Sequence, residues 1–161
     1  MPESIKVGIA DMNICRAPDS ITTIGLGSCV GIVIRDPLLK IGGMIHIMLP
    51  DSTVIKSNSN VSKFADTGIP ELVRQLEAQG CVRRRMEAKI AGGAQMFAFQ
   101  NKSELLGVGE RNIAASKKVL AELGIPLLSE DTGENYGRTV TFYPENGVYE
   151  IKAGGKETKK I

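Results

Sequence analysis

The sequence predicts a single α+β domain, a layered sandwich of mixed β-sheets flanked by helices. Three observations predict it. The first 50 residues consist mainly of apolar, β-branched segments separated by turn residues. Two segments with helical spacing follow, at residues 66–79 and 110–123, and strand-like segments close the chain. Because strands and helices do not alternate one by one, this order disfavours repeated βαβ units.

Four strands are expected in the first half of the chain, at residues 5–10, 21–24, 30–35 and 41–49. Residues 17–20 and 36–37 contain the proline and aspartate that favour turns between them. The strands at residues 30–35 and 41–49 are therefore expected to pair as antiparallel neighbours.

The first helix is expected from Asp66, where the apolar period becomes helical. Its inward positions share that spacing and are Ile69, Leu72, Val73 and Leu76. Asp66 or Thr67 can cap the beginning of this helix, and Gly80 can end it.

A short strand at residues 86–91 leads into Gly92 and Gly93, a pair that suits a tight turn or the close approach of another group. The second helix, residues 110–123, is expected to stop at Gly124. It should turn four apolar residues inward, namely Ile113, Val119, Leu120 and Leu123. Three strands are then expected to close the domain, at residues 126–130, 138–143 and 148–152, with the Asn146-Gly147 pair forming a hairpin turn.

The composition suits one domain at residues 1–153, followed by a polar, flexible tail at residues 154–161. No apolar run approaches the roughly 20 residues that cross a bilayer, and the N-terminus lacks the pattern of a secretory signal. Three widely spaced cysteines argue against a disulfide framework. We therefore expect a cytoplasmic protein without a membrane span.

Neither nucleic acid nor a cofactor is expected. The formal net charge is only +2, and the one compact basic cluster, residues 83–85, lacks interleaved aromatics, which favours a solvated loop or a protein contact. The glycines of residues 25–31 miss the dinucleotide-binding spacing by one residue and lead into a strand. The three cysteines and the single histidine lack the close spacing of structural zinc sites, so no metal site is expected.

Small residues surround one thiol in the segment Thr23-Ile24-Gly25-Leu26-Gly27-Ser28-Cys29-Val30-Gly31. They allow sharp turns and leave the backbone N–H groups of Gly27 and Ser28 free for an oxyanion hole beside a nucleophilic Cys29. A buried, inert cysteine is the commoner state of an intracellular thiol, so this segment alone leaves both interpretations open.

His46 is the only histidine of the chain and lies in a strand-like run. With residues 37–39 as the turn, position numbers that sum to 76 place Cys29 opposite Ile47, one residue from His46. An imidazole at that distance could lower the thiol pKa through an ion pair and later protonate a leaving amine. A core histidine bonded to a backbone carbonyl is the alternative.

Thr23, six residues before Cys29, is a candidate third group that could orient the imidazole through its hydroxyl or its backbone carbonyl. Threonine is also simply a good strand residue. A cysteine peptidase or a transglutaminase would use the same thioester step as an amidohydrolase, so the residues leave the substrate class open.

The whole chain resembles the CheD family of bacterial and archaeal chemotaxis. The motifs that carry the resemblance run from end to end of the sequence: Thr23-x-Gly25-Leu26-Gly27-Ser28-Cys29-Val30, His46-x-Met48-Leu49-Pro50, Lys63-Phe64-Ala65-Asp66, Gly92-Gly93-Ala94, Gly109-Glu110-Arg111-Asn112, Asp131-Thr132-Gly133 and Gly137-Arg138. One position departs from the family pattern, because Glu134 stands where a second glycine usually follows Gly133.

The resemblance implies that Cys29 is the nucleophile, His46 the base and Thr23 the orienting residue of a chemoreceptor glutamine deamidase. It implies a fold like the catalytic domain of the cytotoxic necrotizing factors. The implied partners are the helices of chemoreceptors, with recruitment to receptor arrays. The implied alternative is an interaction module that binds a CheC-type phosphatase and raises its activity toward phosphorylated CheY. Candidate contact residues for that partner are Phe97, Phe99, Glu110, Arg111 and Asn112.

Overall fold

The computed structural model describes residues 2–54, 60–95 and 107–161. Within them the chain forms two five-stranded sheets, ordered β1-β3-β8-β9-β10 (the first sheet) and β2-β5-β4-β6-β7 (the second sheet). The strands are β1 (Ser4–Val7), β2 (Met12–Arg16), β3 (Ser20–Leu26), β4 (Val30–Asp36), β5 (Ile41–Ile47), β6 (Glu87–Gly92), β7 (Leu127–Thr132), β8 (Arg138–Tyr143), β9 (Val148–Lys152) and β10 (Lys159–Lys160). The helices are α1 (Ala65–Ala78) and α2 (Val108–Glu122), with single 3₁₀ turns at Ser52–Val54, Val61–Lys63 and Arg83–Arg85.

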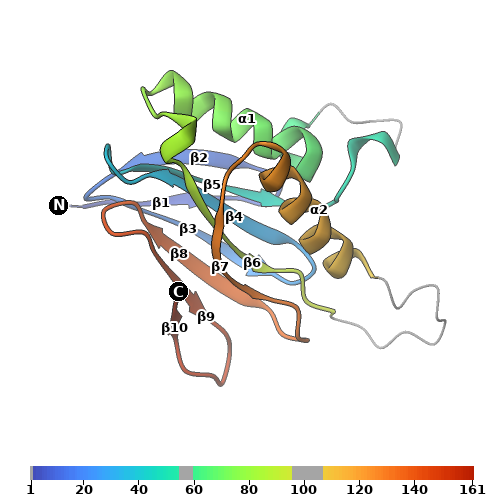
Figure 1. Ribbon diagram of the computed structural model, residues 1–161. Coiled ribbons are helices and arrows are strands. Elements are labelled where there is room, and N and C mark those ends of the chain that lie inside the picture. Colours follow the sequence, from blue (N-terminus) through green and yellow to red (C-terminus); the bar gives the residue numbers. More distant parts are fainter. Residues whose placement is uncertain (1, 55–59, 96–106) are drawn as a thin grey trace.

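The elements stack in three layers, as Figure 1 shows: the two α-helices cover one face of the second sheet, and the first sheet covers the other face. The alternation of side chains along β4 explains the stacking. Ile32 and Ile34 pack into the core beneath the helices, whereas Val33 packs into the core between the sheets. The predicted α+β layered sandwich is therefore confirmed.

The β4–β5 hairpin pairs in a register one residue away from the predicted one. Val30 lies opposite Ile47 and Gly31 opposite His46, so paired positions sum to 77 and not 76. The turn holds one more residue than expected: Asp36 still pairs with Ile41, and Lys40 takes a positive φ of 55°. The shift is decisive for side-chain direction, because one residue of slip turns a strand side chain to the opposite face.

The helices begin and end close to the expected residues, but α1 is not capped as predicted. Its N-cap is Phe64, without a side-chain cap. The Asp66 carboxylate instead accepts hydrogen bonds from the backbone N–H and the hydroxyl of Ser52, at 2.9 and 2.8 Å, and the Thr67 hydroxyl donates to the carbonyl of Val61. Both side chains tie the preceding 3₁₀ turns to the helix.

Residues 159–161, the last part of the tail that was expected to be flexible (residues 154–161), pair with β9. Lys159 and Lys160 of β10 pair with β9, and Ile161 exchanges two backbone hydrogen bonds of 3.0 Å with Tyr149. A polar composition does not prevent such pairing, since an edge strand is bound through its backbone. The sequence also failed to predict β2, whose edge position leaves most of its side chains partly exposed.

The basic cluster at residues 83–85 is not wholly a solvated loop or contact patch. The guanidinium of Arg85 bonds the fully buried carboxylate of Asp36, at 2.7 Å from Nη2 to Oδ2. The same carboxylate accepts backbone N–H groups of Leu38 and Val82. This ion pair fastens the turn of the β4–β5 hairpin to the segment that enters β6.

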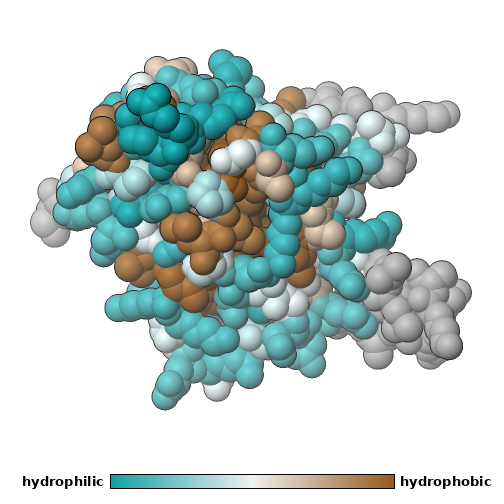
Figure 2. Space-filling view, in the orientation of Figure 1, coloured by the Kyte–Doolittle hydropathy of each residue, from teal (hydrophilic) through white to brown (hydrophobic). Residues whose placement is uncertain are grey.

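The surface in Figure 2 is mostly polar at its periphery, with apolar side chains gathered near the centre of the view. Leu128 on β7 is one of the large apolar residues left exposed, at 52%. None of the helices in the described ranges is long and apolar enough to cross a membrane.

Candidate active site

Cys29 lies in the short loop that joins β3 to β4. Its side chain is half-buried and packs against the apolar core between the two sheets. The loop is held from outside by two backbone donors: the N–H of Ala94 bonds the carbonyl of Gly27, and the N–H of Gly93 bonds the carbonyl of Cys29, both at 2.8 Å. The thiol is therefore presented by a loop whose backbone is fixed.

Gly92 and Gly93 allow this close approach, as the sequence predicted. Their φ angles are +112° and +69°, a region that strongly favours glycine. A Cβ at Gly92 would lie 2.3 Å from the carbonyl oxygen of Cys29. Any other residue at this position would push β6 away from the cysteine loop.

His46 stands on β5 and is fully buried. Its Nδ1 lies 2.8 Å from the hydroxyl oxygen of Thr23 on β3, and the same hydroxyl donates to the carbonyl of Val7 on β1 at 2.7 Å. A threonine hydroxyl has one hydrogen, and a carbonyl oxygen can only accept. The proton between Thr23 and His46 must therefore belong to Nδ1.

This tautomer leaves Nε2 of His46 as an unprotonated acceptor. Among the described residues Nε2 has no hydrogen-bond partner, although it is buried. Buried polar atoms are nearly always paired, so an unpaired one calls for an explanation. In this tautomer Nε2 is chemically able to accept a proton.

Strand geometry puts Cys29 and His46 on the same side of the second sheet. Gly31 lies directly opposite His46, and Cys29 stands two residues before Gly31, in the loop directly before β4, at a position that corresponds to a diagonal neighbour of His46. Such neighbours are about 7–8 Å apart at their Cα atoms, within reach of long or aromatic side chains. Gly31 lies between them. A larger residue would not fit there, because the hydroxyl of Tyr149 lies only 2.7 Å from where its Cβ would stand.

Burial shifts the pKa values of His46 and Cys29 in the directions that favour their neutral forms. Desolvation lowers the pKa of His46 to about 4. Desolvation also raises the pKa of the Cys29 thiol, and the residue's own backbone N–H opposes this shift. Both shifts favour the neutral thiol and the neutral imidazole over the ion pair that the sequence analysis considered.

The backbone N–H groups of Ser28 and Cys29 are the available donors beside the thiol. Neither donates to a carbonyl within the described part of the chain. The N–H of Gly27, by contrast, bonds the carbonyl of Gly25 at 3.1 Å. Of the predicted pair Gly27 and Ser28, the N–H of Gly27 is therefore engaged, and the N–H groups of Ser28 and Cys29 are the ones that remain available in the described structure.

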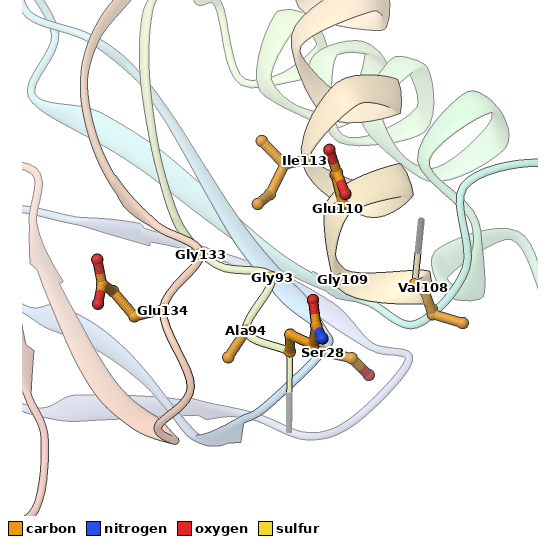
Figure 3. A pocket seen from close by; sticks show the side chains of 11 residues that line it. Ser28, Gly93, Ala94, Val108, Gly109, Glu110, Ile113, Gly133 and Glu134 are labelled. Atoms are coloured by element: carbon orange, nitrogen blue, oxygen red, sulfur yellow. The ribbon is translucent and has the colours of Figure 1, made fainter. Parts of the chain in front are cut away.

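A cavity of about 370 Å³ opens beside Ser28. Figure 3 shows it between the glycine turn after β6, the beginning of α2 and the loop after β7. Its lining is largely apolar and includes Ile113. Two exposed carboxylates, Glu110 and Glu134, complete the rim.

Comparison with known proteins identifies the family. A family model described as CheD chemotactic sensory transduction matches residues 48–153, more than half of the chain. This chain belongs to the CheD family. A CheD protein of Lachnoclostridium phytofermentans is 62% identical over 161 residues, covering 100% of both chains. One from Clostridium novyi is 51% identical over 159 residues, covering 99% of this chain and 98% of the relative.

A third CheD relative, from Caldanaerobacter subterraneus, is 50% identical over 157 residues and covers 98% of this chain and 97% of its own. All three are named probable chemoreceptor glutamine deamidases. Among solved structures, the hypothetical protein YfiH of Bacillus licheniformis superposes with a TM-score of 0.50 at 12% identity, over 78% of this chain and 51% of the other. That likeness concerns the fold alone.

The residues predicted for a partner surface of this CheD protein fall into three groups. Phe97 and Phe99 lie outside the described residues. Glu110 and Arg111 are exposed at the beginning of α2. Asn112 is fully buried, and its amide bonds two backbone carbonyls, so it cannot contribute to a surface and is removed from the predicted set.

Two groups close to the candidate site were not assigned to it by the sequence analysis, which gave Asn112 only as a partner-contact residue. The carbonyl of Val7 left no signal, because any residue supplies a backbone carbonyl. Asn112 did leave one: it occupies an inward position of an amphipathic helix, four residues before the equally buried Ser116. Polar side chains on the buried face of a helix need partners, and this pattern could have drawn attention to it.

Proposed function

We propose that this CheD-family chain is a protein-glutamine deamidase that hydrolyses glutamine side chains of chemoreceptors. Cys29 is the nucleophile, His46 the general base and Thr23 the orienting residue. The observation that carries the proposal is the Val7–Thr23–His46 hydrogen-bond chain, which leaves Nε2 unprotonated and without a partner in the described structure. The names of the relatives support the substrate.

In the first step, Nε2 of His46 takes the thiol proton while the sulfur of Cys29 bonds the carboxamide carbon of the glutamine. The electrons of the carbonyl double bond move to its oxygen. The N–H groups of Ser28 and Cys29 hold the resulting oxyanion. Thr23 keeps the imidazolium in place, because its hydroxyl oxygen accepts the Nδ1 hydrogen throughout.

In the second step, the imidazolium gives its proton to the nitrogen of the tetrahedral intermediate, and ammonia leaves. A thioester between Cys29 and the substrate remains. Water then attacks the thioester carbon and loses its proton to Nε2, and that proton returns to the departing sulfur. The net reaction converts glutamine and water to glutamate and ammonia, and it regenerates the thiol.

The neutral resting pair suits this order of events. A base must be unprotonated when the substrate binds, and burial of His46 ensures this at neutral pH because its pKa is about 4. The cost is a thiol that is not ionised in advance. Proton transfer must therefore accompany the attack, which makes the reaction depend on close alignment of sulfur and Nε2.

The direct test is to incubate purified receptor with the wild-type protein and with the Cys29→Ala variant. Wild type should release ammonia and give receptor peptides the mass gain of glutamine-to-glutamate conversion, and the variant should do neither. Ammonia release by Cys29→Ala at the wild-type rate would remove the mechanism. Adding a primary amine separates a transglutaminase, which would yield an amine adduct in place of glutamate.

A second role, stimulation of a CheC-type phosphatase, needs no thiol. We propose the exposed Glu110 and Arg111 at the beginning of α2 as part of its contact surface, beside the cavity near Ser28. Chemoreceptor substrates and this partner would both bring the protein to receptor arrays. If Cys29→Ala still stimulates the phosphatase while Glu110→Lys and Arg111→Glu do not, the two roles are separate. Unchanged stimulation in both charge variants would exclude this surface.

A further inference from the structure

Asn112 joins the two segments that carry the proposed nucleophile and base. It projects inward from α2 and is fully buried. Its Nδ2 lies 2.9 Å from the carbonyl oxygen of Ser28, the residue before Cys29, and 2.9 Å from that of Met48, two residues after His46. One amide group therefore uses both of its hydrogens on the backbone of the proposed site.

The Ser28 carbonyl has a particular significance. It belongs to the same peptide group as the N–H of Cys29, one of the two free donors beside the thiol. Among the described residues the only cis peptide bond is Ala17-Pro18, so the Ser28–Cys29 peptide is trans. In a planar trans peptide the carbonyl and the N–H point in opposite directions. A group that fixes the carbonyl of Ser28 thereby fixes the direction of the Cys29 N–H.

The neighbouring peptide groups are fixed in the same way, but by backbone donors. The N–H of Ala94 holds the Gly27 carbonyl, and the N–H of Gly93 holds the Cys29 carbonyl. Asn112 is thus the member of this set that acts through its side chain. Its bond also strengthens the donor, because a peptide whose carbonyl accepts a hydrogen bond is polarised toward a better N–H donor.

We infer that Asn112 is a positioning residue for the oxyanion hole, which aims the N–H of Cys29 and holds it in register with His46. The inference rests on the proposed deamidase function. The side-chain amide of Asn112 bonds backbone carbonyls, so Asn112 acts through the Ser28–Cys29 peptide group.

The inference predicts a defect in stabilising the transition state, with the thiol itself intact. In Asn112→Ala the N–H of Cys29 is still present but no longer aimed. Deleting an oxyanion donor outright costs about 10²–10³-fold in kcat, so the loss here should be about 10–100-fold. KM for a receptor peptide should change by less than about threefold, because the interaction is made mainly in the transition state.

Alkylation of Cys29 by iodoacetamide distinguishes a positioning role from a merely structural one. A structural defect would slow alkylation and deamidation together, whereas a misaimed oxyanion donor would slow deamidation alone. The sulfur displaces iodide from a CH₂ group, so no oxyanion forms, and the rate reports only the acidity and access of the thiol. We expect the Cys29 alkylation rate of Asn112→Ala, followed by peptide mass spectrometry, to stay within about twofold of wild type.

Ser116→Ala is the matched control. Ser116 lies one turn further along α2 and is equally buried, and within the described ranges its hydroxyl bonds only the carbonyl of Asn112, at 2.7 Å. It should deamidate like wild type. If Asn112→Ala does not fold, Asn112→Ser replaces it, since its hydroxyl can still donate to one of the two carbonyls; a smaller loss of kcat with unchanged alkylation is then expected.

Wild-type kcat in a folded Asn112 variant would overturn the inference. So would a loss of alkylation as large as the loss of deamidation, because Asn112 would then position the thiol and not the donor. The proposed function is judged separately, by wild type against Cys29→Ala. A failure there leaves both wild type and Ser116→Ala inactive, a pattern that a failure of the Asn112 inference cannot produce.

Discussion

The β4–β5 hairpin buries a titratable side chain near each end, and the two are treated in opposite ways. At the turn, the Asp36 carboxylate accepts bonds from Arg85 and two backbone N–H groups, and its pKa falls to about 2, against a desolvation that opposes the shift. At the open end, the imidazole of His46 bonds Thr23 through Nδ1, and its Nε2 has no partner in the described residues.

The difference in hydrogen bonding distinguishes a buried group that stabilises the fold from one that can take part in a reaction. A buried group with every bond satisfied is fixed in one protonation state and fastens the fold. A buried group with one atom left open keeps a proton-accepting position that the fold does not use. Asp36 is held as an anion that stabilises the fold, whereas in the proposed function His46 is held neutral as the base. Four experiments would sharpen or break this contrast.

The largest effect is expected for His46→Gln, which keeps a similar volume but removes the base. The deamidation kcat should fall by roughly 10²–10⁴-fold, the usual contribution of a general base. Cooperative unfolding in denaturant should show that the domain remains folded. A variant that keeps a tenth or more of the wild-type kcat would mean that the open end of the hairpin is not the reactive one.

Asp36→Asn should show the opposite behaviour. It leaves Arg85 facing a neutral amide in a buried site, which typically costs about 3–5 kcal/mol, and the lower end applies because Arg85 is partly exposed. The free energy of unfolding, measured in urea, should report this loss. The kcat of the folded fraction should remain that of wild type; a large fall would show that the two ends are not independent.

The two ends of the β4–β5 hairpin should affect the free energy of unfolding in two different pH ranges. His46 has a folded pKa of about 4, below its ordinary value of 6.5, so the unfolded chain binds the proton more readily. Stability is lost as pH falls from about 6.5 to 4, by up to about 3 kcal/mol. Asp36 also has a lowered folded pKa, and its contribution is lost lower, as pH falls from 3.8 toward about 2.

Urea unfolding across pH checks both windows. His46→Gln should flatten the curve between pH 6.5 and 4, and Asp36→Asn should flatten it only below pH 4. If both variants retain the wild-type slope in both windows, the two buried groups do not control acid stability.

The smallest effect is expected for Thr23→Val, which preserves shape but removes the hydroxyl. The imidazole loses the acceptor that fixes its tautomer, so kcat should fall by about 10–100-fold, less than on loss of the base itself. Thr22→Val is the control, because its hydroxyl bonds the carbonyl of Val140 at 2.6 Å, outside the site. Equal kcat values for the two variants would remove the orienting role of Thr23.

The fold was largely predictable because its strands and helices carry regular apolar patterns. β8 and β9 have the predicted bounds, and β4 extends one residue further than predicted. The misses have specific causes. β2 and β10 are edge strands, bound through their backbones, and so have weak side-chain patterns. The one-residue register error arose because the sequence does not state which turn residue takes the left-handed conformation that Lys40 adopts.

The sequence by itself singled out Thr23, Cys29 and His46 as the candidate reactive set and indicated the family. Only the tertiary structure decided how they relate. The tautomer of His46 depends on the Val7 carbonyl of a strand parallel to β3, and the aim of the Cys29 N–H depends on Asn112 from a distant helix. The sequence determines which side-chain groups are present, whereas the direction of a backbone N–H or carbonyl is set only when the sheets and helices pack together.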